Sequence, residues 1–143
     1  MIRLNTNVQL DNGAVATHYV LGIVTVANQK IDLTLDGFIN AELANTAMRK
    51  MNLEKQQKDL INQFREIAEK EEQTEKEQDT MSNLQNQINE IAAEINASKE
   101  YSNYVIDCEF ASIPYTENIT KSYILEEILK LDKFKDATEY NVK

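Results

Sequence analysis

The side chains best suited to nucleophilic chemistry are His18 and Cys108, the one histidine and the one cysteine of the chain. A Cys–His pair becomes a nucleophile when the imidazole accepts the proton of the thiol. Each lies in a run that is typical of a strand, so one sheet could hold both. However, Cys108 alternates with Ile106 and Phe110, which predicts inert packing on the apolar face with a raised thiol pKa. We therefore expect His18 to be a hydrogen-bonded structural residue, and we expect no catalytic residue.

The acidic run from Glu69 to Thr80 is the next candidate for chemistry, because carboxylates can hold divalent cations. It contains six acids, two lysines and no apolar residue. On a helix or turn, such a run is typical of a solvated charged face. One cysteine and one histidine cannot build a zinc site without several carboxylates, and the glycine-rich loops that bind phosphates are absent. We expect neither a metal nor a cofactor.

Composition limits the class of partner. The 143 residues are 42% hydrophobic and 27% charged, which suits one soluble domain. A net charge of -9 would repel phosphate backbones and anionic lipids, so we expect no nucleic acid. The longest mostly apolar run, Tyr19 to Ala27, is about half the roughly 20 residues of a membrane span. Met1 to Leu10 does not resemble a signal peptide, so we expect a cytosolic context without membrane insertion.

The first forty residues predict a three-stranded meander. Leu4 to Leu10 alternates between apolar and polar side chains, as a half-buried strand requires. Asn12-Gly13 then favours a two-residue hairpin turn. Val15 to Val26 is apolar on both faces, which predicts a central strand covered on two sides, and Gly22 marks a bulge or a close approach. Ile31 to Asp36 alternates again and supplies the third strand.

The segment from Ala41 to Ser98 has no glycine or proline and is rich in strong helix formers. Apolar residues recur there at spacings of three and four, in the seams Leu60, Phe64, Ile67 and Met81, Leu84, Ile88, Ile91, Ile95. The second seam has coiled-coil spacing, and its register does not continue the first. The segment is therefore either one long helix or an antiparallel hairpin that turns inside the acidic run. Either Thr74 with Glu77 or Ser82 with Gln85 can start the second helix as a capping box.

The C-terminal segment favours the hairpin. Tyr104 to Phe110 alternates as another strand, which needs the N-terminal sheet as its partner. Both ends of the helical segment must then lie close together, unless parallel oligomers of long helices reunite strands from different chains. Pro114 ends this strand, Thr116 to Phe134 returns to helical spacing, and a frayed polar tail follows. The predicted buried face of this helix consists of Ile124, Leu125, Ile128, Leu129 and Leu131.

The predicted fold is α+β: a small antiparallel sheet with a C-terminal helix and a long projecting helical hairpin or coiled coil. The expected parts are a β-meander over residues 1–40, a helical insertion over 41–98, and a returning strand with the C-terminal helix over 99–143. The seams either pack only on each other or also pair with another copy or a partner helix, since two helices alone bury little surface.

Two motifs stand at the ends of the chain. The first is Asn12-Gly13-Ala14-Val15-Ala16-Thr17-His18-Tyr19, and the second is Tyr123-Ile124-Leu125 followed by Phe134-Lys135-Asp136-Ala137. They resemble the Gly-Ala-x-Ala-Thr hairpin and the C-terminal helix with a Phe-x-x-Ala element of small tail-associated structural proteins of tailed bacteriophages. The order His18-Tyr19 and the presence of Asp136 depart from the family pattern, and the helical segment is longer than in its compact members.

This resemblance implies a non-enzymatic structural or docking component of a phage tail tip or baseplate. We expect a homo-oligomer, with a trimer or hexamer favoured, that also binds other tail or baseplate proteins. Such a protein is made in the host cytoplasm and ends in the virion. The alternative is a cytosolic partner-binding module or tail-assembly chaperone with an acidic helical hairpin.

Overall fold

The fold was obtained as a computed structural model, which describes residues 1–141. The chain divides into two compact units. Residues 1–45 and those from 104 onward form the first, which we call the β unit. Residues 46–103 form the second, which we call the helical unit.

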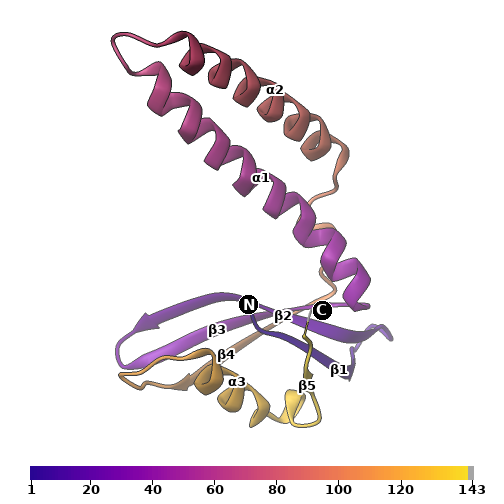
Figure 1. The fold of residues 1–143 in the computed structure, drawn as a ribbon. Helices are drawn as coiled ribbons and strands as arrows, with labels where there is room; N and C mark the ends of the chain where they lie inside the picture. The colour runs from indigo at the N-terminus through magenta and orange to yellow at the C-terminus, as the bar shows by residue number, and fades with distance from the viewer. Residues whose placement is uncertain (142–143) are drawn as a thin grey trace. The chain divides into compact units, whose positions relative to one another are not determined.

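Within the described residues, five strands form one sheet in the order β4-β3-β2-β1-β5, with every neighbouring pair antiparallel. The strands are β1 (Arg3–Gln9), β2 (Val15–Ala27), β3 (Lys30–Phe38), β4 (Asp107–Pro114) and β5 (Thr138–Glu139). Figure 1 shows this sheet with helix α3 on one side of it. The predicted α+β class and the return of the fourth strand to the N-terminal meander are both confirmed.

The two hairpin turns differ from each other, and the first differs from its prediction. Gly13 donates its N–H to the carbonyl of Leu10 at 3.0 Å and has a φ of 87°. The turn therefore has three residues, Asp11 to Gly13, and only its glycine adopts a positive φ. The predicted two-residue turn at Asn12-Gly13 is wrong. A two-residue turn lies instead between β2 and β3, where Asn28 and Gln29 have φ values of 52° and 61°.

Strand β2 is central in its first half and exposed in its second. β1 begins at Arg3, opposite Val20, so among the described strands only β3 pairs with residues 22–27. The register shifts between Leu21 and Val24, and a Cβ on Gly22 would lie 2.7 Å from Thr34 Oγ1. The predicted bulge and close approach at Gly22 are thus confirmed. The prediction that the whole strand is covered on two sides is wrong, because residues 22–27 are exposed.

Strand β4 presents the opposite face from the one predicted. Phe110 is 75% exposed, and Cys108 is exposed on the same side of the strand. Asp107 and Glu109 are partly buried on the other side, where both carboxylates accept hydrogen bonds from Lys133. Carboxylates can occupy a partly buried face when a cation pairs with them, which the apolar pattern alone does not reveal. The strand ends at Pro114, as predicted.

The core of the β unit lies between the sheet and the segment formed by α3 (Lys121–Leu129) and the 3-10 helix η2 (Asp132–Phe134). The core residues are Ile2, Leu4, Ala16, Tyr19, Ile31, Leu33, Leu35, Ile113, Ile124, Ile128, Phe134 and Ala137. Helix α3 is shorter than the predicted Thr116–Phe134. It begins only after Thr120, whose side chain accepts from the N–H of Tyr123, and Leu131 is extended. The predicted buried face is confirmed, because its residues are buried or packed against the core.

The end of the chain is more ordered than the predicted frayed tail. Thr138 and Glu139 pair with Asn5 and Leu4, which adds β5 to the sheet. Tyr140 then donates its N–H to the carbonyl of Arg3 at 2.8 Å. The prediction of fraying is therefore wrong up to Tyr140, and for residues 142–143 it lies outside the described residues.

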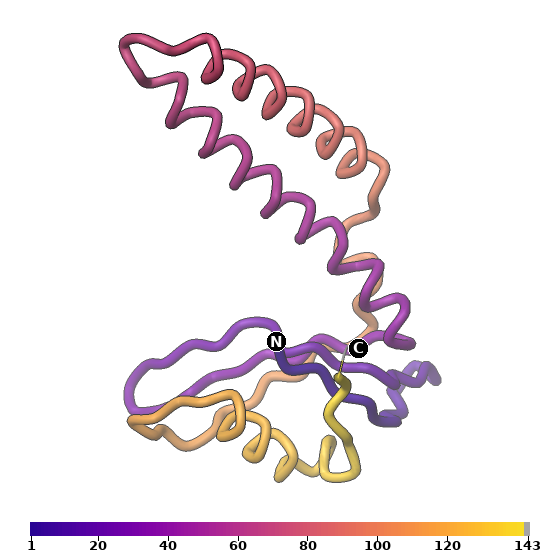
Figure 2. Tube along the Cα trace, in the orientation of Figure 1, coloured from indigo at the N-terminus to yellow at the C-terminus, as the bar shows by residue number. Residues whose placement is uncertain are grey.

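The helical unit contains an antiparallel hairpin rather than one long helix. Helix α1 (Ala41–Ala68) begins in the β unit and continues into the helical unit, where α2 (Glu75–Ala97) and the 3-10 helix η1 (Tyr101–Asn103) follow. Figure 2 shows the trace reversing direction between α1 and α2. The capping box lies at Thr74 and Glu77, the first of the two predicted pairs. Coiled-coil packing of these helices stays a prediction.

Candidate functional site

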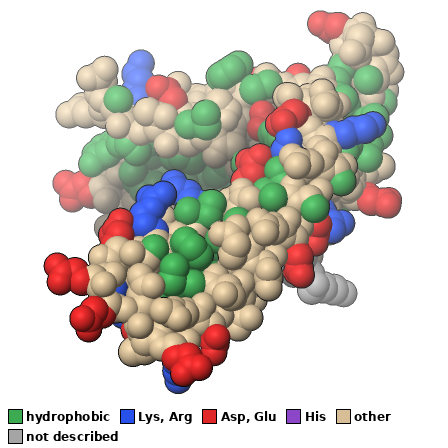
Figure 3. All heavy atoms as spheres, turned by 90° about the horizontal axis from the view of Figure 1, so that it is seen from above, with side chains coloured by type: hydrophobic (Ala, Val, Ile, Leu, Met, Phe, Trp, Pro, Cys, Tyr) green, Lys and Arg blue, Asp and Glu red, His purple; other side chains and the backbone are tan. Residues whose placement is uncertain are grey.

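The two apolar seams of the hairpin are the candidate site. The structure describes every predicted seam residue, and Leu84 is the one among them that is buried, at 7% exposure. Leu60, Phe64, Ile67, Met81, Ile88, Ile91 and Ile95 are only partly buried. Figure 3 shows apolar side chains reaching the surface among polar and acidic ones on its visible face. Packing of α1 on α2 therefore leaves part of the seam open to solvent.

The seams meet near the closed end of the hairpin. Phe64 of α1 and Met81 of α2 line one hollow of about 410 Å³ together with glutamines and Ser82. Two further apolar residues of α1, Leu53 and Ile61, are also partly buried, and the sequence reasoning missed them. Leu53 lies seven residues before Leu60, so a longer heptad window would have found it.

Ion pairs connect the two helices outside the seams. Arg49 of α1 contacts Glu94 of α2 at 3.5 Å, and both side chains are more than half exposed. Near the turn, Lys70 donates to Glu77, which together with the backbone of Thr74 lowers the pKa of the Glu77 carboxyl. These pairs are compatible with the antiparallel hairpin, but exposed pairs contribute little to stability.

His18 lies in a buried cluster of the β unit. Its Nε2 accepts from Arg3 Nε at 2.9 Å, so the ring proton is on Nδ1, which lies 3.2 Å from Asn5 Oδ1. Tyr140 packs edge-on against His18 at 4.9 Å and also lies beneath the Arg3 guanidinium at 4.6 Å. Burial and the Arg3 charge lower the pKa of His18 to about 4. The predicted hydrogen bonding of His18 is confirmed.

Cys108 does not contact His18. His18 is on β2 opposite Phe38, whereas Cys108 is on β4 opposite Asp36, so β3 lies between them. Two strand spacings separate them by about 10 Å, which prevents direct proton transfer. Partial burial and a hydrogen bond to Asp36 raise the pKa of the Cys108 thiol. The predicted packing of Cys108 on the apolar face is wrong, because its side of β4 faces solvent.

A second polar cluster joins β4 to η2. Lys133 donates to Asp107 at 2.8 Å and to Glu109 at 2.7 Å, and Tyr19 also donates to Asp107. Burial alone would raise the pKa of Asp107, but the hydrogen bonds from Lys133 and Tyr19 lower it. The sequence reasoning missed this cluster because its members come from three distant segments. Its groups satisfy one another, so it stabilises the position of η2 beside the sheet.

Within residues 1–141, no three His, Cys, Asp or Glu side chains come together in a group that could hold a metal ion. Among the helices of residues 1–141, none is long and apolar enough to span a membrane. Comparisons of the chain with models of protein families, with curated proteins and with solved structures found no match.

Proposed function

We propose that this protein is a non-enzymatic structural or docking component that forms oligomers through its helical hairpin. The observation that carries the proposal is the incomplete burial of the seams, in which Leu84 is the one buried residue. Burying apolar surface contributes about 25 cal/mol per Å², so a second hairpin laid on the seams would stabilise the assembly. Bundles of several hairpins bury such seams in a common core.

The setting we propose is the tail tip or baseplate of a bacteriophage. The end motifs that resemble small tail proteins occupy positions that shape the β unit. Gly13 forms the positive-φ corner of the first hairpin, and Phe134 and Ala137 lie in the core. These motifs therefore act in folding, which agrees with a structural role. Tail components assemble on threefold and sixfold axes, so we favour a trimer or a hexamer.

Light scattering on a size-exclusion column, at two protein concentrations, tests the oligomer. We expect a mass of three or six chains that does not depend on concentration. Replacing Ile88→Glu places a charge in the seam and should dissociate the assembly. The exposed neighbour Gln87→Glu adds the same charge outside the seam and should leave the mass unchanged. A wild-type monomer at both concentrations contradicts oligomerisation through the hairpin.

The setting needs a separate test. If the protein is a tail component, mass spectrometry of purified virions of the parent phage should detect it. Deleting its gene should then abolish infectious tails. Infectious particles that form normally without the protein, and that never contain it, contradict the proposed setting.

The acidic turn of the hairpin favours a second candidate, a partner-binding module or assembly chaperone. Six acids and two lysines lie between Glu69 and Thr80, and most of these side chains are exposed. Such a surface suits a basic partner helix. This candidate predicts a monomer that forms a one-to-one complex and is absent from finished particles.

A further inference from the structure

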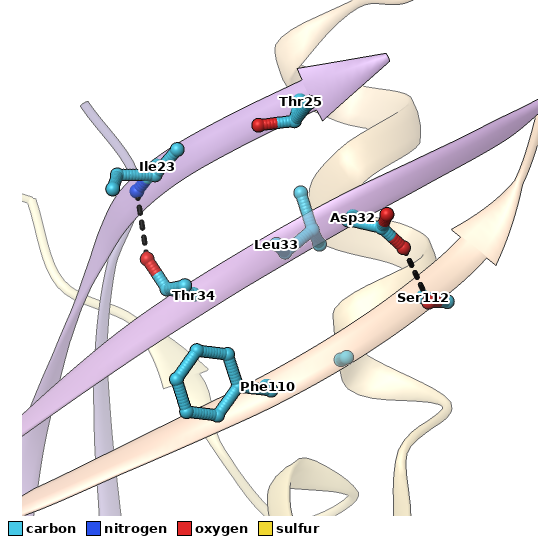
Figure 4. Close-up of a pocket in the computed structure, with 8 residues that line it drawn as sticks. Ile23, Thr25, Asp32, Leu33, Thr34, Phe110 and Ser112 are labelled. Atoms are coloured by element: carbon cyan, nitrogen blue, oxygen red, sulfur yellow. Dashed lines mark hydrogen bonds between the residues drawn. The ribbon is translucent and has the colours of Figure 1, made fainter. Parts of the chain in front are cut away.

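The second half of β2 leaves a strand edge open in the β unit. Hydrogen-bonded pairing with β1 ends where Leu21 donates to the carbonyl of Ile2. Residues 22–27, which we call the free edge, pair with β3 on one side and lie along the three-strand part of the sheet. Figure 4 shows Ile23 and Thr25 of the free edge at the margin of a shallow hollow, with β3 between them and β4.

The free edge lacks most features that protect natural strand edges. Residues 22–27 read Gly-Ile-Val-Thr-Val-Ala and include neither a charged residue nor a proline. Lysine, proline or a covering loop usually prevents such an edge from pairing with another chain. Here Ile23 is 66% exposed, Val24 38% and Val26 48%, and the one protective device is the bulge at Gly22. An uncharged, β-branched and exposed edge is a template for another strand.

The turn after the free edge determines which main-chain groups are available. A two-residue turn closes on a hydrogen-bonded pair, which here is Ala27 with Lys30. Because hydrogen-bonded pairs recur at every second residue of an antiparallel strand, Thr25 also pairs in this way, with Asp32, and directs its N–H and C=O groups toward β3. Val24 and Val26, by contrast, direct their N–H and C=O groups away from β3. These outward groups define the register that an added strand can take.

We propose that the free edge pairs antiparallel with the free edge of a second copy, about a twofold axis at Thr25. Val24 then forms a hydrogen-bonded pair with Val26 of the other copy, and Val26 forms the same pair with Val24 of the other copy. The two pairs supply about four main-chain hydrogen bonds. Thr25 lies opposite itself in a non-hydrogen-bonded pair. The four valines share one face of the joined sheet, so apolar surface that is open in one copy is covered by the other.

The sequence of the edge favours a copy of itself over a different strand. The register places valine opposite valine and threonine opposite threonine, which are favourable cross-strand pairs, and no like charges meet. A partner selected by charge would find no complementary charge in residues 22–27. This pairing goes beyond the proposed function. It joins two β units about a twofold axis, whereas the proposed trimer or hexamer forms through the helical hairpin.

Disulfide cross-linking tests the register in the full chain. Cys108→Ser provides a background without cysteine, and Thr25→Cys then places two thiols opposite each other with Cα atoms about 4.5 Å apart. Oxidised glutathione should convert this variant to a covalent dimer. The matched control Ala27→Cys pairs with Ile23 of the other copy, so its two thiols lie about 13 Å apart and should stay reduced. Equal cross-linking of both variants, or of neither, overturns the proposal.

Charge substitution gives an independent readout. Thr25→Lys and Thr25→Glu each place like charges opposite each other, and each should weaken the pairing about tenfold. If hairpin trimers are joined in pairs to six chains, the mass measured by light scattering should then fall toward three chains, and mixing the two variants should restore it. Thr25→Val, which keeps the β-branched shape, should leave the mass unchanged. A Thr25→Lys protein with the wild-type mass overturns the proposal and leaves the hairpin oligomer untouched.

Discussion

The β unit and the helical unit both have regularly spaced apolar residues. Within one chain, those of the β unit are largely buried, whereas those of the hairpin seams are mostly only partly buried. In the β unit, Leu4, Tyr19 and Leu35 of the sheet are fully buried against Ile128 and Phe134. In the hairpin, one predicted seam residue is buried and the others stay partly exposed. The difference arises because α3 and η2 form a second layer over the sheet, whereas no such layer covers the seams of α1 and α2 within the described residues.

This comparison teaches that periodicity identifies an apolar face but not what covers it. A face covered within the chain contributes to the stability of the monomer. A face left half open contributes more when a further copy or partner binds. We therefore expect the β unit to carry most of the monomer's unfolding free energy, and the hairpin to open locally at lower cost.

Truncation of one core residue in each unit should separate the two most clearly. Phe134→Ala removes a fully buried ring that packs edge-on against Tyr19 at 4.9 Å, and should cost about 3–5 kcal/mol of unfolding free energy. The matched change in the hairpin, Ile91→Ala, should cost about 1 kcal/mol in the monomer, because the side chain is only partly buried. Urea denaturation measures both. Equal losses at the two positions contradict the comparison.

Acid should weaken the β unit through His18. Its pKa is about 4 in the folded chain and 6.5 in the unfolded chain, because burial and Arg3 disfavour the charged ring. The unfolded state therefore binds the proton first, and about 2–3 kcal/mol of stability should be lost as the pH falls from about 6.5 to 4.

A series of urea titrations at successive pH values measures this loss. His18→Gln keeps a group that can accept from Arg3 but cannot titrate, so its stability should vary less over this interval. An unchanged pH dependence in that variant rules out His18 as the source. The helical unit contains no histidine, so its local opening should not follow the same profile.

The sequence predicted the strands and helices well where a periodic pattern acted alone. The turn between the helices was predictable because Thr74 and Glu77 have capping-box spacing within a polar run. The first hairpin turn was not, because the dipeptide Asn12-Gly13 suits a two-residue turn and a three-residue turn that ends in glycine. The inward face of β4 was also missed, since Asp107 requires Lys133, which follows 26 residues later.

The candidate site was predictable as a set of apolar positions but not as a surface. Heptad spacing identified Ile88 and Ile91, and it could not show that both remain partly exposed. The free edge of β2 was hidden for a similar reason. Its apolar residues resemble those of a buried central strand. Residues 22–27 have β3 as their one neighbouring strand because β1 begins at Arg3, opposite Val20.

Removing the cap of α2 should have a moderate effect that is confined to the hairpin. The Thr74 side chain accepts from the N–H of Glu77, and Glu77 accepts from the N–H of Thr74. Thr74→Ala should cost about 1 kcal/mol of hairpin stability. Hydrogen exchange of the α2 amides measures it, with Thr80→Ala inside α2 as the control. Amides of the β unit should keep their exchange rates, and faster exchange there would show that the units unfold together.

The smallest effect should come from the exposed ion pair Arg49–Glu94. Its side chains are 69% and 52% exposed, so solvent screens the attraction and the coupling energy should be about 0.3 kcal/mol. A double-mutant cycle with Arg49→Ala and Glu94→Ala measures this coupling by urea denaturation. A coupling near that value leaves the apolar seams as the main attraction between α1 and α2. A coupling energy above about 1 kcal/mol would instead mean that ion pairing contributes substantially to the packing of α1 on α2. Burial of the seams would then not explain the stability of the hairpin.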